Sequence, residues 1–233
     1  MRRAAALLAV AALVAGCGGA KPNGTATVWI TRDRGAHVLV VRTVPSGLTA
    51  MQAVQRVASV KTRYGGRFVQ SIDGVAGSLS ARRDWFYFVN GYEADRGASE
   101  YTLHPGDVEW WDFRSWANGE YRVPVVVGAF PEPFLHGYGG NRRRAVVATP
   151  NPETGRALAK FLHARYVHVD RDVHVDQRNY AFAGRDENIL FVMRGPTRFT
   201  ATTTGAGGRV LFRFSGDWHD LLNGKYRYRY DVE

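Results

Sequence analysis

Cysteine is nearly absent from this chain of 233 residues: Cys17 is the only one. An internal disulfide is therefore excluded, and packed apolar cores must stabilise the folded protein. Lysine is also scarce, since only four of the 31 basic residues are lysines and the formal charge of +10 is carried almost entirely by arginine. The apolar run near the N-terminus is shorter than the ~20 residues that a membrane-spanning helix needs.

Patterns of catalytic residues are missing as well. The glycine-rich stretch Gly137-Tyr138-Gly139-Gly140 lacks the Lys-Ser/Thr that completes a phosphate-binding loop. Serine, histidine and aspartate are present, but no nucleophile-elbow pattern accompanies them. The sequence therefore favours a protein that is not an enzyme.

The N-terminus has the pattern of a bacterial lipoprotein signal. Arg2-Arg3 precede an apolar stretch from Ala4 to Val14, and small residues lead to Cys17. This pattern predicts a signal peptide over residues 1–16, lipidation (palmitate included) of Cys17, and a short polar tether over 17–23. The location predicted is the extracytoplasmic face of the cell membrane. The alternative is an ordinary secretory signal in which the cysteine is incidental.

The sequence of the first half predicts a small sheet covered by one helix. Two strands in a hairpin, a helix with Thr49 as a possible N-cap, and three further strands follow in the order of a β-grasp, ubiquitin-like fold. We therefore expect an α+β protein whose first domain covers residues 24–118. The expected strands are 25–31, 37–44, 68–72, 85–89 and 108–113, and the expected helix is 48–60.

The second half, residues 119–233, predicts a mixed α/β domain of unknown function. A continuous apolar run such as Arg144 to Thr149 is typical of a strand that is covered on both faces. Thr154 is a candidate N-cap for a helix that continues through Arg165. Strands are also expected at 123–127, 166–175, 189–193, 199–203, 210–214 and 226–232, with a short helix at 218–222.

Several short motifs in the first half resemble a known family. They are Ser71-Ile72-Asp73-Gly74-Val75-Ala76-Gly77, Arg83-Asp84-Trp85-Phe86-Tyr87-Phe88-Val89, Gly97-Ala98-Ser99-Glu100-Tyr101 and the closing Ser115-Trp116. In this order they are similar to the C-terminal β-domain of transcobalamin and intrinsic factor, and to bacterial exported proteins that carry this domain alone. The resemblance covers about residues 25 to 116.

The resemblance implies a domain that presses loops and a strand edge against one face of a cobalamin. In that family the contacts come largely from a serine-containing loop and from the main chain of the aromatic strand. The helical barrel that holds the rest of the vitamin in that family has no counterpart here. Carried over by position, the contacts fall on Ser71, Gly74, Ala76, Trp85, Phe88, Val89 and Asn90.

Tryptophans are concentrated in the stretch that carries this resemblance. Trp85, Trp110, Trp111 and Trp116 could form a platform for a flat ring or a sugar, or they could belong to the core. Trp110 and Trp111 are adjacent on an expected strand, so they point to opposite faces of its sheet. Both can be buried only if neither face meets water, and we expect about one of the four to be exposed.

A row of acidic residues and histidines offers a possible metal site. His168, Asp170, Asp172, His174 and Asp176 alternate with other residues, so on a straight strand they share one face. His168 and His174 would then lie ~20 Å apart, which is too far for one metal ion unless the segment turns back. A solvated sheet face is the favoured interpretation, and no metal is predicted.

Arginines also gather at 142–144 and at Arg227 and Arg229. A lipid-anchored protein outside the cytoplasm has little occasion to bind nucleic acid, so this partner is not expected. The predicted function is capture of a soluble small molecule, with a corrinoid such as cobalamin as the named candidate and no resident cofactor. The alternative is an interaction module that docks a transport or envelope protein, or an acidic polymer, through the Trp110 region and the arginines.

Overall fold

The computed structural model describes residues 24–117, 121–170 and 182–233. Cys17 and the predicted signal and tether lie outside the described residues. So do Asp172, His174 and Asp176 of the acidic and histidine row. No helix in the described part of the chain is both long and apolar enough to cross a membrane.

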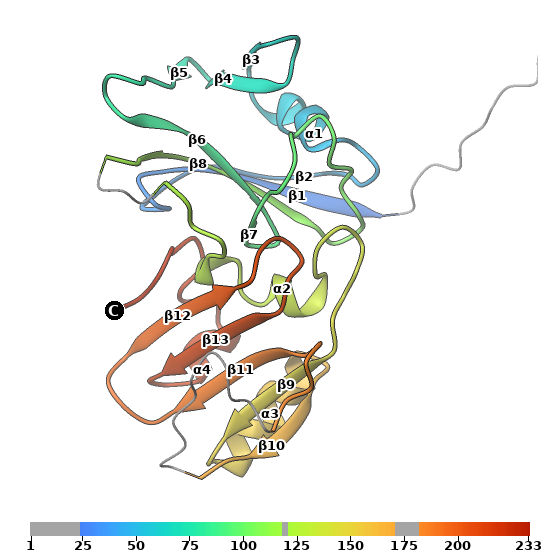
Figure 1. Cartoon of the computed structure of the whole chain (residues 1–233), viewed down its shortest axis with the longest axis vertical. Helices are drawn as coiled ribbons and strands as arrows, with labels where there is room; N and C mark the ends of the chain where they lie inside the picture. The colour runs from blue at the N-terminus through green and yellow to red at the C-terminus, as the bar shows by residue number, and fades with distance from the viewer. Residues whose placement is uncertain (1–23, 118–120, 171–181) are drawn as a thin grey trace, which may run out of the picture.

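The structure is a mixed α/β protein in which strands dominate and helices are few (Figure 1). One five-stranded sheet, with the order β2-β1-β8-β6-β7, occupies the half drawn in blue and green. A second five-stranded sheet, with the order β10-β9-β11-β13-β12, occupies the half drawn in yellow to red. A three-stranded sheet, β3-β4-β5, lies beside α1 at the far end of the first half.

The elements of the first half have the following bounds: β1 Thr25–Arg32, β2 His37–Pro45, α1 Ala50–Val57, β3 Val60–Arg63, β4 Phe68–Ile72, β5 Val75–Ala76, β6 Arg83–Val89, β7 Tyr92–Glu93 and β8 Val108–Ser115. Those of the second half are η1 Val127–Ala129, α2 Glu132–Leu135, β9 Ala145–Thr149, α3 Pro152–Phe161, β10 Arg165–His168, β11 Asn188–Met193, β12 Arg198–Thr203, β13 Val210–Ser215 and α4 His219–Leu222.

The first sheet is built around two parallel neighbours, β1 and β8. Antiparallel partners flank them, β2 beside β1 and β6 beside β8. In β1 the residues Ala26, Val28 and Ile30 alternate with Trp29 and contribute to one core, whereas Trp29 belongs to another. Alternate side chains of a strand point to opposite faces, so both faces of this sheet carry packed apolar side chains.

Helix α1 covers one face of this sheet. Its buried residues, Ala50, Met51, Ala53 and Val54, form one stripe that packs into the same core as Val28 and Ile30. Thr49 is the N-cap, as the sequence predicts, and Gln52 completes a capping box with it.

The opposite face of the first sheet is covered by the second half. Trp29, Phe88 and Trp110 pack there against Val126 and Tyr230. In Figure 1 the C-terminus accordingly lies between the two halves. Both Trp110, at 0% exposed, and Trp111, at 3%, are therefore buried, and neither face of the sheet beneath them is open to water.

The second sheet has a parallel centre. β9 pairs in parallel with β10 and with β11, and β11 pairs in parallel with β13, while β12 joins antiparallel at the edge. The chain passes from β9 to β10 through α3, the crossover that parallel neighbours require. Residues of β9 and β11 are buried almost throughout, as expected for strands covered on both faces.

Four predicted elements of the second half are wrong in extent or kind. Residues 123–127 form no strand; Val125 makes one bridge, with Tyr92, and a 3-10 turn follows. Residues 226–232 form no strand: their backbone groups bond to η1, and Val232 makes only an isolated bridge to Phe199 of β12. Strand β10 ends at His168, and helix α3 ends at Phe161 with Asn151, not Thr154, as its N-cap.

Candidate functional site

The predicted contact residues divide into exposed and buried sets. Gly74 and Ala76, in and beside the turn between β4 and β5, are exposed. Ser71 is 4% exposed and belongs to β4. The side chains of Trp85, Phe88, Val89 and Asn90 are buried as well. Among the predicted contact residues, only Gly74 and Ala76 are exposed, and those of β6 can offer only their backbone.

The backbone of β6 is unpaired along part of its outer edge. β6 pairs with β8 on one side over its whole length. On its other side Arg83 bridges to Ser78, and Phe88 and Val89 pair with β7. Between these anchors the Trp85 N–H donates to Asp84 Oδ1 at 2.8 Å, and the Tyr87 carbonyl accepts from the Ala94 N–H at 3.3 Å. No described group donates to the Trp85 carbonyl.

This open edge lies against the exposed turn. Trp85 Nε1 donates to the Val75 carbonyl at 2.8 Å and so ties the strand to the turn. The Asp84 carboxyl packs so close to Gly77 that a Cβ there would lie 2.3 Å from Oδ1. Burial raises the pKa of Asp84, while the Trp85 N–H opposes that shift. The turn, Asp84 and the open edge thus form one continuous polar rim, which we call the β6 rim.

Asn90 takes no part in the β6 rim. Its amide donates to Asp107 Oδ1 at 2.7 Å and to the Gly137 carbonyl at 3.0 Å, and its oxygen accepts from the Val108 N–H at 2.7 Å. With a positive φ of 49° before Gly91, at 84°, it forms an Asn-Gly turn between β6 and β7. Asn90 therefore joins the turn between β6 and β7 to the second half of the chain.

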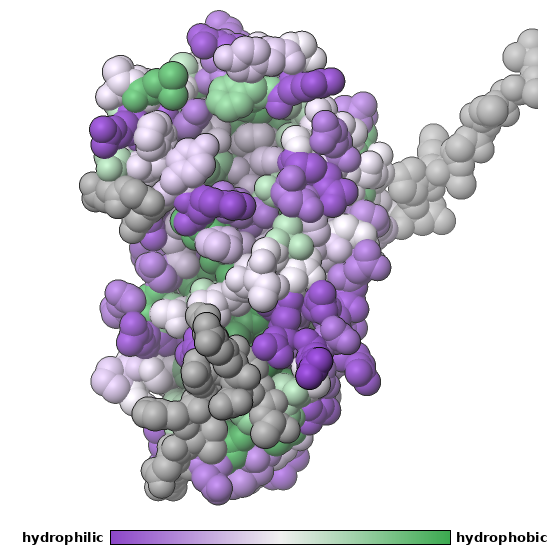
Figure 2. All heavy atoms as spheres, in the orientation of Figure 1, coloured by the Kyte–Doolittle hydropathy of each residue, from purple (hydrophilic) through white to green (hydrophobic). Residues whose placement is uncertain are grey.

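No tryptophan of the predicted platform is exposed: Trp85 is 7% exposed, Trp110 and Trp111 are buried more deeply, and Trp116 is partly buried. Trp111 stacks on Tyr87 with ring centroids 4.9 Å apart, and Trp110 packs edge-on to Trp29 and Tyr230. The expectation of about one exposed tryptophan is therefore wrong. The face of the molecule in Figure 2 shows hydrophobic residues only in separate small patches among polar ones.

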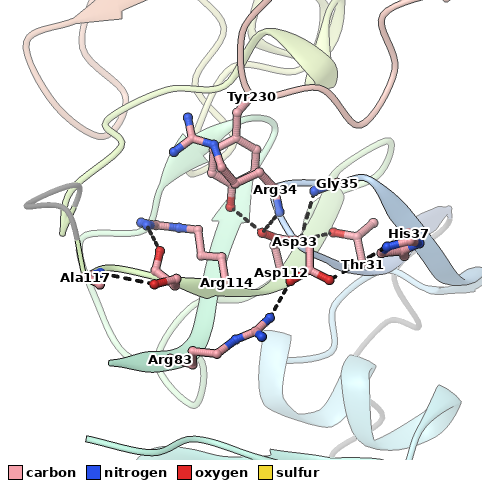
Figure 3. Close-up of polar contacts among 11 residues, drawn as sticks. Thr31, Asp33, Arg34, Gly35, His37, Arg83, Asp112, Arg114, Ala117 and Tyr230 are labelled. Carbon is pink, nitrogen blue, oxygen red and sulfur yellow. Dashed lines mark hydrogen bonds and ion pairs between the residues drawn. The ribbon is translucent and has the colours of Figure 1, made fainter. Parts of the chain in front are cut away.

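A buried carboxylate, Asp112 of β8, joins the first sheet to the C-terminal segment (Figure 3). It accepts from the Thr31 hydroxyl at 2.6 Å, from the backbone N–H groups of Arg34 and Gly35 at 3.1 Å each, and from the Tyr230 hydroxyl at 2.9 Å. Burial and the charge of Asp112 raise the pKa of Tyr230 well above its ordinary value. Every donor comes from this chain, so the cluster is a structural junction between distant segments.

The predicted arginine surface is only partly free. Arg142 donates to the carbonyls of Phe134, Leu162 and His163, and Arg143 donates to that of Gly207. Both therefore support local structure, although Arg142 is exposed, as are Arg144, Arg227 and Arg229.

The acidic and histidine row is represented by two described residues, His168 and Asp170. His168 contacts the Tyr166 hydroxyl at 3.2 Å. Within residues 24–117, 121–170 and 182–233, no three His, Cys, Asp or Glu side chains gather in a way that could hold a metal ion.

A cavity that the sequence does not predict lies in the second half, at one end of β9, β11 and β13. Its polar lining includes Thr149, Thr154, Arg194 and Asp217. The signal that could have located it is the strand order, because side chains that follow parallel strands meet at one edge of the sheet.

Comparisons with known proteins cover part of the chain. A family described as a domain of unknown function, DUF4430, matches residues 47–115. No curated protein matches. Among solved structures, a candidate metal-binding protein from Ruminococcus gnavus ATCC 29149 is 15% identical, with a TM-score of 0.33, over 40% of this chain and 97% of its own. Haptocorrin in complex with Cbi is 16% identical, with a TM-score of 0.32, over 39% of this chain and 25% of its own, so the chain spans a quarter of haptocorrin.

Proposed function

We propose that this chain is an exported, lipid-anchored protein that binds a small molecule and does not catalyse a reaction. The pattern of residues 1–17 supports lipid attachment at Cys17 and a place on the extracytoplasmic face of the membrane. The resemblance to the transcobalamin family, together with the β6 rim, supports ligand binding.

We further infer that residues 24–118 form a β-grasp domain. The two central strands of the first sheet, β1 and β8, are parallel, their outer partners are antiparallel, and α1 crosses one face. One helix clasped by a sheet of this order is the arrangement that defines a β-grasp. The remaining residues, 119–233, form a mixed α/β domain.

The observation that carries the proposed binding role is the open stretch of the β6 edge. An unpaired strand edge presents main-chain donors and acceptors that a ligand can use while the side chains of the strand stay in the core. Burial of Trp85, Phe88 and Val89 is thus compatible with main-chain contact. Because β7 covers the edge at Phe88 and Val89, we assign contact to Trp85 and to the turn that contains Gly74 and Ala76.

Cobalamin is the ligand to test first. We expect titration of the full chain to give a saturable change in cobalamin absorbance and in tryptophan fluorescence. Ala76→Arg, which adds bulk and charge beside the open edge without touching the core, should weaken binding by about tenfold or more. Ser99→Arg is the matched control, because Ser99 is exposed on another loop.

Two results would contradict this proposal. Absence of any change at high micromolar cobalamin would remove the corrinoid as ligand. Equal affinities of Ala76→Arg and Ser99→Arg would place the ligand away from the β6 rim.

A second candidate function is docking of an envelope protein or acidic polymer, and strand β2 favours it. β2 is an edge strand of the first sheet, and Val38, Leu39 and Val41 are 47%, 49% and 38% exposed. An apolar strand with a free edge is a ready site for pairing with another chain. The Trp110 region cannot serve this role, because Trp110 is fully buried.

The docking function is tested by retention on immobilised envelope polymer. Retention that Leu39→Ser abolishes, combined with indifference to cobalamin, would favour docking through β2. Retention that is unchanged in Leu39→Ser would exclude β2 as the docking edge.

A further inference from the structure

The cavity of the second half has a volume of about 670 Å³, within the range of ~300 to 1,000 Å³ that is usual for small-molecule sites. Thr149 closes β9, Met193 closes β11, and Gly216 directly follows β13. These strands run parallel, so the cavity lies beyond their carboxyl ends, where open α/β sheets usually bind ligands. Figure 1 shows the three strands adjacent in the second half.

Two nearly inaccessible hydroxyls line this cavity. Thr149 is 2% exposed and Thr154 is 3% exposed. The Thr149 hydroxyl accepts from the Asn151 N–H at 3.3 Å, so its own hydrogen remains available to donate. The Thr154 backbone N–H donates to Asn151 Oδ1. No described residue provides a hydrogen-bond partner for the Thr154 hydroxyl. Buried polar groups normally have hydrogen-bond partners, so both hydroxyls are suited to an acceptor brought by a ligand.

Among the described residues that line the cavity, Arg194 is the one with a positive side chain. It is exposed, and among described residues no ion pair joins it to an acidic group. Helix α3, of ten residues, begins in the same lining, and its N-terminal end carries a partial positive charge. The Asn151 cap takes two of the helix N–H groups, so the side chains must supply most of the donors.

The lining also includes Asp217 and Trp218. His219 Nδ1 lies 2.6 Å from Asp217 Oδ1, and this hydrogen bond lowers the pKa of Asp217. An acidic ligand group is therefore repelled by Asp217 and attracted to Arg194 and to the start of α3. The Trp218 indole lines the cavity and stacks on His219 with ring centroids 3.9 Å apart, and Val192 and Met193 add apolar surface.

We propose that this cavity binds a small organic anion. Arg194 and the hydroxyls of Thr149 and Thr154 hold its carboxylate or phosphate group, and its flat apolar part lies against Trp218. The volume exceeds what an inorganic anion fills, which is why the ligand has an organic body. This site is separate from the β6 rim, and it does not depend on the proposed capture of cobalamin.

The test is a titration of the ¹⁵N-labelled full chain with four probes, followed by nuclear magnetic resonance. Phenyl phosphate and benzoate carry a ring and an acidic group, benzyl alcohol carries the ring alone, and inorganic phosphate carries the charge alone. The readout is the Trp218 indole N–H signal, assigned by its loss in Trp218→Phe. We expect at least one of the two aromatic anions to shift this signal at millimolar concentration or below, and to bind at least about tenfold more tightly than benzyl alcohol and inorganic phosphate. The stronger of the two anions identifies the acidic group.

Two variants locate the acidic group. Arg194→Ala should weaken binding of the preferred anion by about tenfold, because a charge-assisted hydrogen bond is lost. Thr154→Val, nearly equal in shape, should weaken it by about threefold to tenfold. The matched control is Arg156→Ala, which removes the same charge from an exposed position of α3 outside the cavity and should bind as the unaltered chain does.

The proposal is overturned if no probe shifts the Trp218 signal, if benzyl alcohol binds as tightly as the anions, or if Arg194→Ala binds like Arg156→Ala. Equal affinity for inorganic phosphate and phenyl phosphate would overturn the assignment of an organic body. Because Arg194 is exposed, its replacement tests the proposal even if Thr154→Val proves unstable.

Discussion

At the scale of single residues, the most unusual group is a carboxyl in the core of the first half. Glu109 of β8 is 0% exposed, and burial raises its pKa well above the ordinary value of 4.5. Trp111 Nε1 donates to its Oε1 at 2.5 Å, which partly opposes this shift, and Oε2 has no partner among the described residues. The carboxyl is therefore protonated in the folded protein at pH values where an unfolded chain has lost the proton.

This difference predicts how stability depends on pH. Above about pH 4.5 the unfolded chain releases the Glu109 proton while the folded chain keeps it, so stability falls as the pH rises toward the folded pKa. Glu109→Gln keeps an oxygen for Trp111 and has no proton to lose. It should raise the free energy of unfolding by about 1 to 3 kcal/mol near pH 7.5. Urea unfolding at pH 4 and pH 7.5 measures this, with the gain absent at pH 4.

Glu100→Gln is the control, because Glu100 is exposed and should show no such gain. A gain for Glu109→Gln that persists unchanged at pH 4 would show that packing, and not ionisation, is responsible.

At the scale of elements, short sequence motifs predict the features that depend on residues a few positions apart, such as a helix cap. Thr49 caps α1 as predicted, because its hydroxyl accepts from the N–H of Gln52, three residues on. The predicted end of that helix at Val60 is wrong, since Ala58 is already extended and Val60 pairs with Ile72 of β4. The predicted start of α3 at Thr154 is wrong, although the residues that mark its true start are adjacent in the sequence. Asn151 directly before Pro152 is a standard N-cap followed by proline at N1.

The capping box of α1 gives a prediction for this scale. Thr49→Ala removes the oxygen that accepts from the Gln52 N–H at 3.2 Å, and it should lower the free energy of unfolding by about 1 kcal/mol. Gln55→Ala, at an exposed position of the same helix, should change it by less than about 0.5 kcal/mol. Equal effects of the two substitutions in urea unfolding would show that the cap contributes nothing.

At the scale of the whole molecule, the sequence predicts that Trp110 and Trp111 point to opposite faces of their sheet, but it does not predict that both faces are covered. The cover of Trp110 comes from Val126 and from Tyr230, which is 120 positions further along the chain. Contacts at such separations leave no periodic pattern, and the alternation of Tyr226 to Tyr230 suggested a strand instead. The cavity was missed for the same reason, because its walls come from residues near 150, 194 and 217.

The junction between Tyr230 and Asp112 should contribute measurably to stability. Tyr230→Phe keeps the ring in place but removes the only side-chain donor that the C-terminal segment gives to Asp112 among the described residues. We expect a loss of about 1.5 to 3 kcal/mol, as is usual for a hydrogen bond to a charged group. Tyr121→Phe, on a side chain that is 62% exposed, should be neutral in the same urea unfolding experiment. A neutral Tyr230→Phe would mean that Thr31 and the two N–H groups satisfy Asp112 by themselves.

The position of Tyr230 also bears on the order of events during synthesis. The segment around it covers tryptophans that precede it by 120 to about 200 positions, so a nascent chain exposes these tryptophans until Tyr230 has left the ribosome. Expression of the first half alone would leave that apolar surface uncovered, and we would expect such a fragment to aggregate.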